Sequence, residues 1–205
     1  TLFRSPCQAF SKLRYLAFHR GYQVKENLIP EFERVVAEAK PRWFLMENVP
    51  DAPDAAVPGY EVTTFKLNNR WVPEATPQNR LRKFSFGHRG EPVNLFSYIQ
   101  LSPVEPAEFE YAVTASNPGV KYTPDQRVIN PRTGKVNRLP GGTGGQRRTL
   151  AECCELQGLP RDFFDETPFT AEGKQRMLGN GVPLPMGRAL AAAVRAFLVE
   201  GYSGV

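Results

Sequence analysis

A helical segment followed at once by a buried apolar run most constrains the fold of this chain. Residues 30–39 place apolar side chains at helical spacing after a proline, which is tolerated at a helix start. Pro41 ends this helix, and residues 43–46 (Trp-Phe-Leu-Met) form a continuous apolar run, as in a strand buried on both faces of a parallel sheet. Polar residues follow from Glu47. This order predicts an α/β fold, whose sheets bind ligands at the carboxyl ends of the strands.

The rest of the chain extends this prediction on both sides of an irregular segment. We expect further strands at 60–67 and 83–87, and helices at 11–20, 149–157 and 187–199. From His88 onward prolines recur and long helical periodicity disappears, until helical spacing returns near Thr149. We therefore predict a catalytic α/β domain in residues 1–87, an inserted region of mostly irregular and β structure in 88–147, and a return to the first domain in 148–205.

Charge divides the irregular segment into two halves. The stretch from Arg89 to Glu110 contains one basic and four acidic residues. The stretch from Lys121 to Arg148 contains seven basic residues and one acidic residue. The whole chain has a net charge of +5, which permits a polyanionic partner such as nucleic acid. The glycine-rich stretch 141–145 is read as a flexible connection in preference to a phosphate cradle.

Cysteine usage and hydropathy predict a cytoplasmic protein. The three cysteines are an odd number without framework spacing, which favours a reducing compartment, and we find no signal peptide. The most apolar stretch, residues 189–199, contains Arg195 and is shorter than the roughly 20 apolar residues that span a bilayer. We expect no membrane contact and no metal site.

Cys7 is the strongest candidate for a reactive group. It stands in Ser-Pro-Cys-Gln at residues 5–8, where proline and glutamine are poor choices for a segment that fills a core. The adjacent Cys153 and Cys154 fit the ordinary interpretation of buried small hydrophobes. Taken alone, Glu47 could be a simple carboxylate at a strand end. The alternating Gln78, Arg80 and Arg82 could likewise be the solvated face of an edge strand.

Five short motifs in sequence change these interpretations. They are Ser-Pro-Cys-Gln at 5–8, Glu-Asn-Val at 47–49, Gln-x-Arg-x-Arg at 78–82, Glu-Cys with Leu-Gln-Gly-Leu-Pro at 152–160, and Gly-Asn-Gly-Val-Pro at 179–183. The series resembles the cytosine-5 DNA methyltransferase family over nearly the whole chain except the variable segment from about 88 to 146. Ser5 stands where the family usually has a second proline, and Glu74-Ala75-Thr76 replaces a glycine-bearing approach.

The resemblance implies a reaction and a role for four residues. The cysteine that matches Cys7 adds to C6 of a flipped cytosine, which loads electron density onto C5 so that C5 can accept a methyl group. The matching glutamate, Glu47, acts as a general acid at N3. Arg82 would contact the carbonyl at O2, and Arg80 would brace the site or a phosphate. The family also implies DNA methylation in roles such as restriction-modification, in a prokaryotic or phage-like context.

The resemblance further implies partners. The methyl donor would be S-adenosylmethionine, with a remaining wall formed by Pro6, Asn180, Gly181 and Val182. The partner would be double-stranded DNA, contacted by Gln8, Ser11, Gln78, Arg127, Arg132, Lys135, Arg138 and Arg147. The family's glycine-rich first strand lies upstream of the cysteine motif, and the chain opens at Thr1 without it. We therefore expect the cofactor-binding half upstream or on a second chain. A transfer-RNA methyltransferase of the same fold and a catalytically silent DNA-binding remnant are the alternatives.

Overall fold

The computed structural model describes residues 2–4, 10, 26–115, 117–119, 128–129, 136–137 and 147–202. These residues form two compact units. The first unit is drawn from residues 1–67, 81–99 and 191–205, and the second from residues 68–80 and 100–190. The division predicted from the sequence, into 1–87, 88–147 and 148–205, is based on the positions of the motifs and not on compactness. It therefore stays a prediction.

A four-stranded sheet forms the centre of the first unit. Its strand order is β1 (Leu2–Arg4), β2 (Trp43–Asn48), β5 (Leu81–His88) and β3 (Glu61–Asn68). β1 and β2 are parallel, whereas β2 and β5 are antiparallel. The strands expected at 43–46, 60–67 and 83–87 are therefore confirmed. β2 is buried on both faces as expected, although only one of its neighbours is parallel to it.

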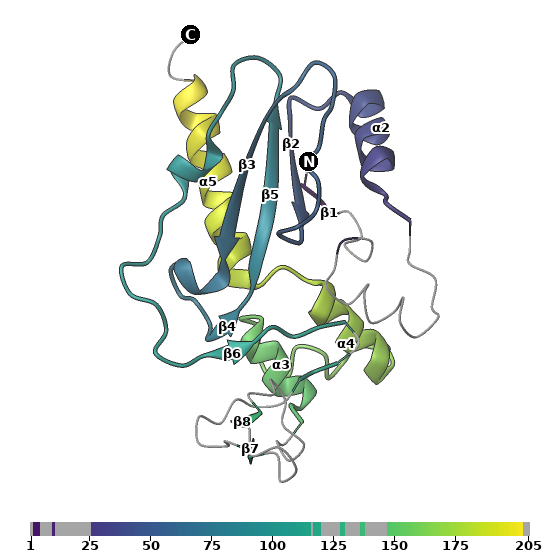
Figure 1. Ribbon diagram of the computed structural model, residues 1–205, viewed down its shortest axis with the longest axis vertical. Coiled ribbons are helices and arrows are strands. Elements are labelled where there is room, and N and C mark those ends of the chain that lie inside the picture. The colour runs from purple at the N-terminus through teal and green to yellow at the C-terminus, as the bar shows by residue number, and fades with distance from the viewer. Residues whose placement is uncertain are drawn as a thin grey trace. The chain divides into compact units, whose positions relative to one another are not determined.

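Helices cover both faces of this sheet. The predicted helix at 30–39 is α2 (Ile29–Ala39), and its Phe32 ring lies 5.4 Å from the ring of Phe44 on β2. On the other face, Phe197 of α5 (Leu184–Tyr202) lies 5.7 Å from Phe86 on β5. Figure 1 shows α2 and α5 on either side of the strands. Because each face of β2 meets a helix, its apolar run is continuous rather than alternating. The short helix η3 (Leu95–Tyr98) completes the unit.

Helices make up most of the regular structure described in the second unit. It contains η2 (Asn69–Trp71), β4 (Gln78–Asn79) paired in parallel with β6 (Glu110–Tyr111), α3 (Leu150–Leu156), α4 (Ala171–Asn180) and the first turns of α5. Two further short strands, β7 (Val128–Ile129) and β8 (Val136–Asn137), pair antiparallel. The expected helix at 149–157 is confirmed as α3, and Cys153 and Cys154 are buried in the core of this unit, as expected. The helix expected at 11–20 lies outside the described residues.

α4 is a helix that the sequence pattern did not indicate. Its segment is polar and contains two glycines, and of its ten residues only Leu178 and Gly179 are buried. The one local signal is Thr170, whose hydroxyl accepts a hydrogen bond from the Gly173 amide as an N-cap.

Two tests of the described residues concern membranes and metals. No single described helix is long and apolar enough to cross a bilayer, although α4 and α5 pass the length and composition test as a pair bent by 42°. Within the same described part of the chain, no group of three or more His, Cys, Asp or Glu residues is arranged to bind a metal ion.

Candidate active site

Two of the predicted catalytic residues form an ion pair in the first unit. Glu47 is opposite Phe84 in the antiparallel register of β2 and β5, and Arg82 lies two residues before Phe84. Because side chains alternate along a strand, Glu47 and Arg82 project from the same face of the sheet. Their Oε1 and Nε atoms are 2.8 Å apart. The antiparallel pairing of β2 with β5 thus brings Glu47 and Arg82 together.

This ion pair is largely withdrawn from water. The side chain of Glu47 is 3% exposed and that of Arg82 is 15% exposed, and Arg82 Nη1 also donates to the Leu81 carbonyl over 2.7 Å. A buried carboxylate is expensive unless it is paired and hydrogen-bonded, and the guanidinium supplies that pairing. The arrangement presents a carboxyl group and a guanidinium side by side, a combination that can bind the polar edge of a planar base.

The predicted nucleophile follows β1 in the sequence. Arg4, the last residue of β1, is the register partner of Glu47, and the two strands are parallel. The loop after Arg4 therefore begins at the sheet edge where Glu47 lies. Cys7, Pro6, Gln8 and Ser11 lie outside the described residues, so their assigned roles stay predictions.

Gln78 is buried in a set of hydrogen bonds within the second unit. Its Nε2 donates to the Leu156 carbonyl over 2.6 Å, and its Oε1 accepts from the Val113 amide over 3.0 Å. Gln78 is 0% exposed. Both ends of the side-chain amide therefore bind protein groups in this structure, and the assignment of Gln78 to DNA stays a prediction.

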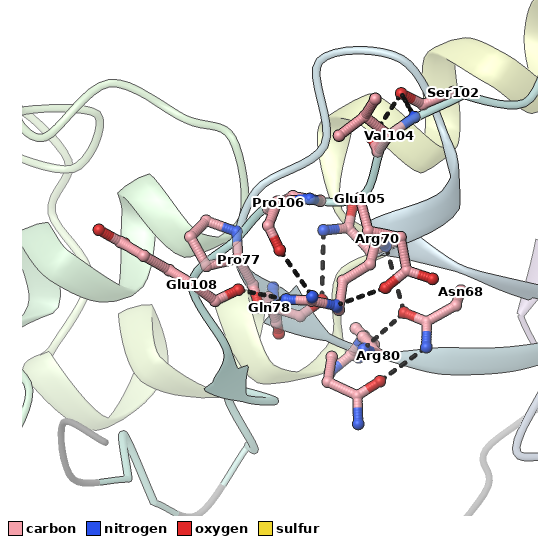
Figure 2. A network of polar contacts seen from close by, with 12 residues as sticks. Asn68, Arg70, Pro77, Gln78, Arg80, Ser102, Val104, Glu105, Pro106 and Glu108 are labelled. Carbon is pink, nitrogen blue, oxygen red and sulfur yellow. Dashed lines mark hydrogen bonds and ion pairs between the residues drawn. The ribbon is translucent and has the colours of Figure 1, made fainter. Parts of the chain in front are cut away.

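Arg80 is also buried, at 1% exposed. Its Nη1 donates to the Val113 carbonyl over 2.9 Å, and its Nη2 donates to the carbonyls of Gly179 and Gly181 over 2.9 and 3.0 Å. Figure 2 shows Gln78 and Arg80 within the surrounding polar contacts. The interpretation of Gln78 and Arg80 as a solvated strand face is wrong, because both side chains are enclosed by protein.

The predicted cofactor residues Asn180, Gly181 and Val182 are all half-buried at the end of α4. The Gly181 amide donates to the carbonyls of Met177 and Leu178 over 2.8 and 3.0 Å, which closes the last helical turn. Partial exposure together with an uncharged amide side chain fits one wall of a site for the methionine or ribose part of a ligand. These three residues alone do not make a complete binding site for such a ligand.

Most of the basic residues assigned to DNA lie outside the described residues, namely Arg127, Arg132, Lys135 and Arg138. Arg147 is described and exposed. Its neighbour Arg148 is buried, is ion-paired with Glu110, and donates to the carbonyls of Tyr111 and Pro118 over 3.0 and 3.1 Å. Adjacent arginines thus have opposite environments, and nothing in the local sequence distinguishes them.

A second arginine with a structural role was missed by sequence reasoning. Arg70 donates to the carbonyls of Pro77, Pro106 and Glu108 and is ion-paired with Glu105 (Figure 2). The side chain thereby fixes the segment that leads into β6. No motif marks Arg70, because three of its four partners are backbone carbonyls and all but Pro77 lie more than thirty residues away.

An acidic cavity in the second unit argues against a phosphate contact at that place. Its volume is about 270 Å³, and four glutamates line it together with Arg148. Since the Arg148 guanidinium is ion-paired with one of these glutamates, the remaining carboxylates would repel a phosphate.

Comparisons with known proteins bear on both the sequence and the fold. The family model of the C-5 cytosine-specific DNA methylases matches residues 3–56, a segment that includes Cys7 and Glu47. None of the curated proteins matches the chain.

Solved structures match over nearly the whole chain. The Dnmt2 methyltransferase of S. pombe is 14% identical with a TM-score of 0.53, and the match covers 98% of this chain and 77% of that one. A mutant of Spodoptera frugiperda DNMT2 is 16% identical with a TM-score of 0.52, covering 94% and 78%. A candidate DNA modification methyltransferase encoded within an E. coli prophage is 14% identical with a TM-score of 0.51, covering 96% and 78%. At these identities the matches show the mixed α/β fold of methyltransferases. The resemblance to the cytosine-5 methyltransferase family inferred from the motifs is therefore confirmed over residues 3–56.

Proposed function

We propose that this chain is the catalytic and recognition portion of a DNA (cytosine-5) methyltransferase. The observation that carries the proposal is the buried ion pair of Glu47 and Arg82, at the sheet edge where β1 ends three residues before Cys7. The strands would be part of a Rossmann-like methyltransferase sheet. Residues 88–147 would form the target-recognition region, and 1–87 with 148–205 the catalytic part, in a cytoplasmic enzyme.

The proposed reaction begins with a cytosine flipped out of duplex DNA, which costs a few kcal/mol. The Cys7 thiolate forms a bond to C6, and the electron pair of the C5–C6 double bond is driven toward N3. Glu47 donates a proton at N3, while Arg82 donates hydrogen bonds to O2, so that no negative charge accumulates on the ring.

Methyl transfer and release complete the cycle. When bound, S-adenosylmethionine would supply the methyl group that C5 accepts and would leave as S-adenosylhomocysteine. The C5 proton would then pass to a base, the C5–C6 double bond would re-form with expulsion of the Cys7 thiolate, and the N3 proton would return to the Glu47 carboxylate. Asn180, Gly181 and Val182, with the backbone near Pro6, would contribute the wall of the donor site that this chain supplies.

A mechanism-based trap tests this proposal. Duplex DNA with 5-fluorocytosine at the target position carries fluorine in place of the proton that must leave, so the Cys7 adduct cannot resolve after methyl transfer. The protein expressed from the full gene is incubated with this DNA and S-adenosylmethionine. Covalent protein–DNA adducts are then separated on a denaturing gel. We expect an adduct with the unaltered protein and none with Cys7→Ala. Cys154→Ala is the matched control, because it removes a buried thiol and should leave the adduct unchanged.

Variants of the ion pair separate chemistry from binding. Glu47→Gln keeps the shape but not the proton, and should slow adduct formation by about 100-fold to 10,000-fold, the usual contribution of a general acid. DNA affinity should stay within about threefold. A Glu47→Gln protein that forms the adduct at the unaltered rate would refute the assigned role.

The recognition region is tested by salt dependence. Arg132→Ala and Lys135→Ala should each lower the slope of log affinity against log salt by about one unit if each side chain contacts one phosphate. An unchanged slope would place the DNA elsewhere.

A transfer-RNA methyltransferase is the second candidate, because two of the solved structures that share the fold are Dnmt2 proteins. Methylation assays on duplex DNA and on transfer RNA separate the two substrates. If DNA binds but neither substrate is methylated and no adduct forms, the chain is a silent binding remnant.

A further inference from the structure

Arg80 is the largest fully buried side chain among the described residues. A guanidinium withdrawn from water must be compensated by hydrogen bonds. The three carbonyls described above come from two segments far apart in the sequence, one at Val113 and one at Gly179 to Gly181. One side chain thus joins a stretch of the proposed recognition region to the turn at the end of α4.

Two independent contacts link the same segments. A Cβ atom added at Gly179 would lie 2.0 Å from the Ala115 amide nitrogen and from the Thr114 carbonyl carbon, so the two backbones are in close approach there. Gln175 on α4 also donates its side-chain amide to the Thr114 carbonyl over 2.8 Å. The end of α4 therefore packs directly on residues 113–115.

The backbone of Arg80 is itself fixed. Its amide donates to Asn68 Oδ1 over 3.2 Å, and its carbonyl accepts from the Asn69 amide over 3.1 Å. A rigid backbone fixes the origin of the side chain, so the guanidinium can impose a position on the carbonyls that it contacts.

We propose that Arg80 is a positioning residue for the turn of Gly179, Asn180 and Gly181, and that it does not bind DNA phosphate. By donating to the carbonyls on either side of Asn180, it would set the orientation of the Asn180 side chain and of the Val182 wall. The consequence for S-adenosylmethionine rests on the proposed function. The positioning of the turn does not.

Amide hydrogen exchange on the complete protein tests the positioning role. Arg80→Lys keeps the positive charge but loses the planar fork that reaches two segments at once. We expect the Gly181 amide, which closes the α4 turn, to exchange at least tenfold faster. The Leu184 amide, which donates to the Gln157 carbonyl, should change less than twofold. Equal protection of Gly181 before and after the substitution would overturn the proposal.

Arg70→Lys is the matched control. Arg70 also donates to several carbonyls of the second unit, but the hydrogen-bond and ion-pair partners of its side chain are residues 77, 105, 106 and 108 and not the turn at Gly181. Loss of the planar Arg70 guanidinium should leave the hydrogen-exchange rate of the Gly181 amide unchanged. If Arg70→Lys accelerates Gly181 as much as Arg80→Lys does, the effect is general destabilisation, and the specific role fails.

A second variant addresses the alternative of a phosphate contact. Arg80→Gln removes the charge. A phosphate-binding arginine would then lower the salt slope of DNA affinity by about one unit, whereas a positioning residue leaves the slope unchanged. A drop of one unit would overturn the proposal. If Arg80→Gln does not fold, the exchange result with Arg80→Lys decides.

The donor site provides the last measurement. Calorimetric affinity for S-adenosylhomocysteine should fall about tenfold in Arg80→Lys and stay within twofold in Arg70→Lys. An unchanged affinity in Arg80→Lys would overturn the link to the donor site. If the unaltered protein does not bind S-adenosylhomocysteine, the cofactor part of the proposed function fails, while the exchange data still decide whether Arg80 positions the turn.

Discussion

The close approach at Gly179 makes a quantitative prediction about stability. Gly179→Ala would place a methyl group 2.0 Å from the backbone at Thr114 and Ala115, whereas real Cβ contacts essentially never fall below 3.0 Å. The neighbours are backbone atoms, so no rotamer change can relieve the overlap. The two segments must separate by about 1 Å, which is of the size that strains or breaks a hydrogen bond.

The expected loss follows from the bonds that span this contact. Separation would stretch the bond from Gln175 to the Thr114 carbonyl, worth about 1 kcal/mol, and the charged bond from Arg80 to the Val113 carbonyl, worth about 2 kcal/mol. Alanine recovers about 1 kcal/mol over glycine within a helix. We therefore expect Gly179→Ala to lower the free energy of unfolding by about 2 kcal/mol.

Gly187→Ala is the matched control, because it makes the same change in α5 and its added Cβ meets no atom within 4 Å. It should raise stability by about 1 kcal/mol. The chain has two tryptophans. In a Trp43→Phe background, Trp71 fluorescence therefore reports unfolding of the second unit. With a slope near 2 kcal/mol per molar urea, the midpoint should fall by about 1 M for Gly179→Ala and rise by about 0.5 M for Gly187→Ala. A Gly179→Ala protein as stable as the unaltered one would refute the packing of α4 on residues 113–115.

Three further perturbations test local features. Lys40, the C-cap of α2, has a φ of 48°, so Lys40→Gly should raise stability by about 1 kcal/mol in urea unfolding, and a loss would contradict the left-handed cap. Thr149 caps α3 in a capping box with Glu152, so Thr149→Ala should lose about 1 kcal/mol and Thr149→Ser should retain most of it; equal losses would exclude the hydroxyl contact. Burial raises the pKa of the Cys153 thiol to about 11, so iodoacetamide should label it at pH 8 only after unfolding. Because the unfolded chain loses this proton first, the contribution of Cys153 to stability should decline as pH rises from about 9 to 11; a titration without such a decline would contradict the raised pKa.

Local patterning was sufficient for α2 and β2. Residues 30–39 and 43–46 carry apolar side chains at the spacing of a helix and in a continuous run, and α2 buries its apolar side chains together with Phe44 and Met46 of β2. α4 escaped the same reasoning, because most of its ten residues are polar and only the last turn is buried. A helix held mainly by a terminal contact leaves little periodicity in its sequence.

The motif at 78–82 shows the limit of sequence reasoning most clearly. Alternation alone is compatible with an exposed strand face, yet Gln78 and Arg80 are buried and Arg82 pairs with Glu47. Whether such a side chain is exposed or buried depends on the groups available to bind it. Arg80 binds the carbonyls of Val113, Gly179 and Gly181, and Arg82 binds the carboxylate of Glu47 on the neighbouring strand.

The sequence by itself determined the α/β class, the order of the motifs and the resemblance to the cytosine-5 methyltransferase family, because apolar periodicity and short motifs are local properties of the chain. Tertiary structure alone decided which charged side chains are buried and what they contact. The physical reason is that a charged side chain can be buried only where hydrogen-bonding groups replace the water it loses. For Arg80 and Arg82 most of those groups belong to residues about 30 to 100 positions away in the sequence.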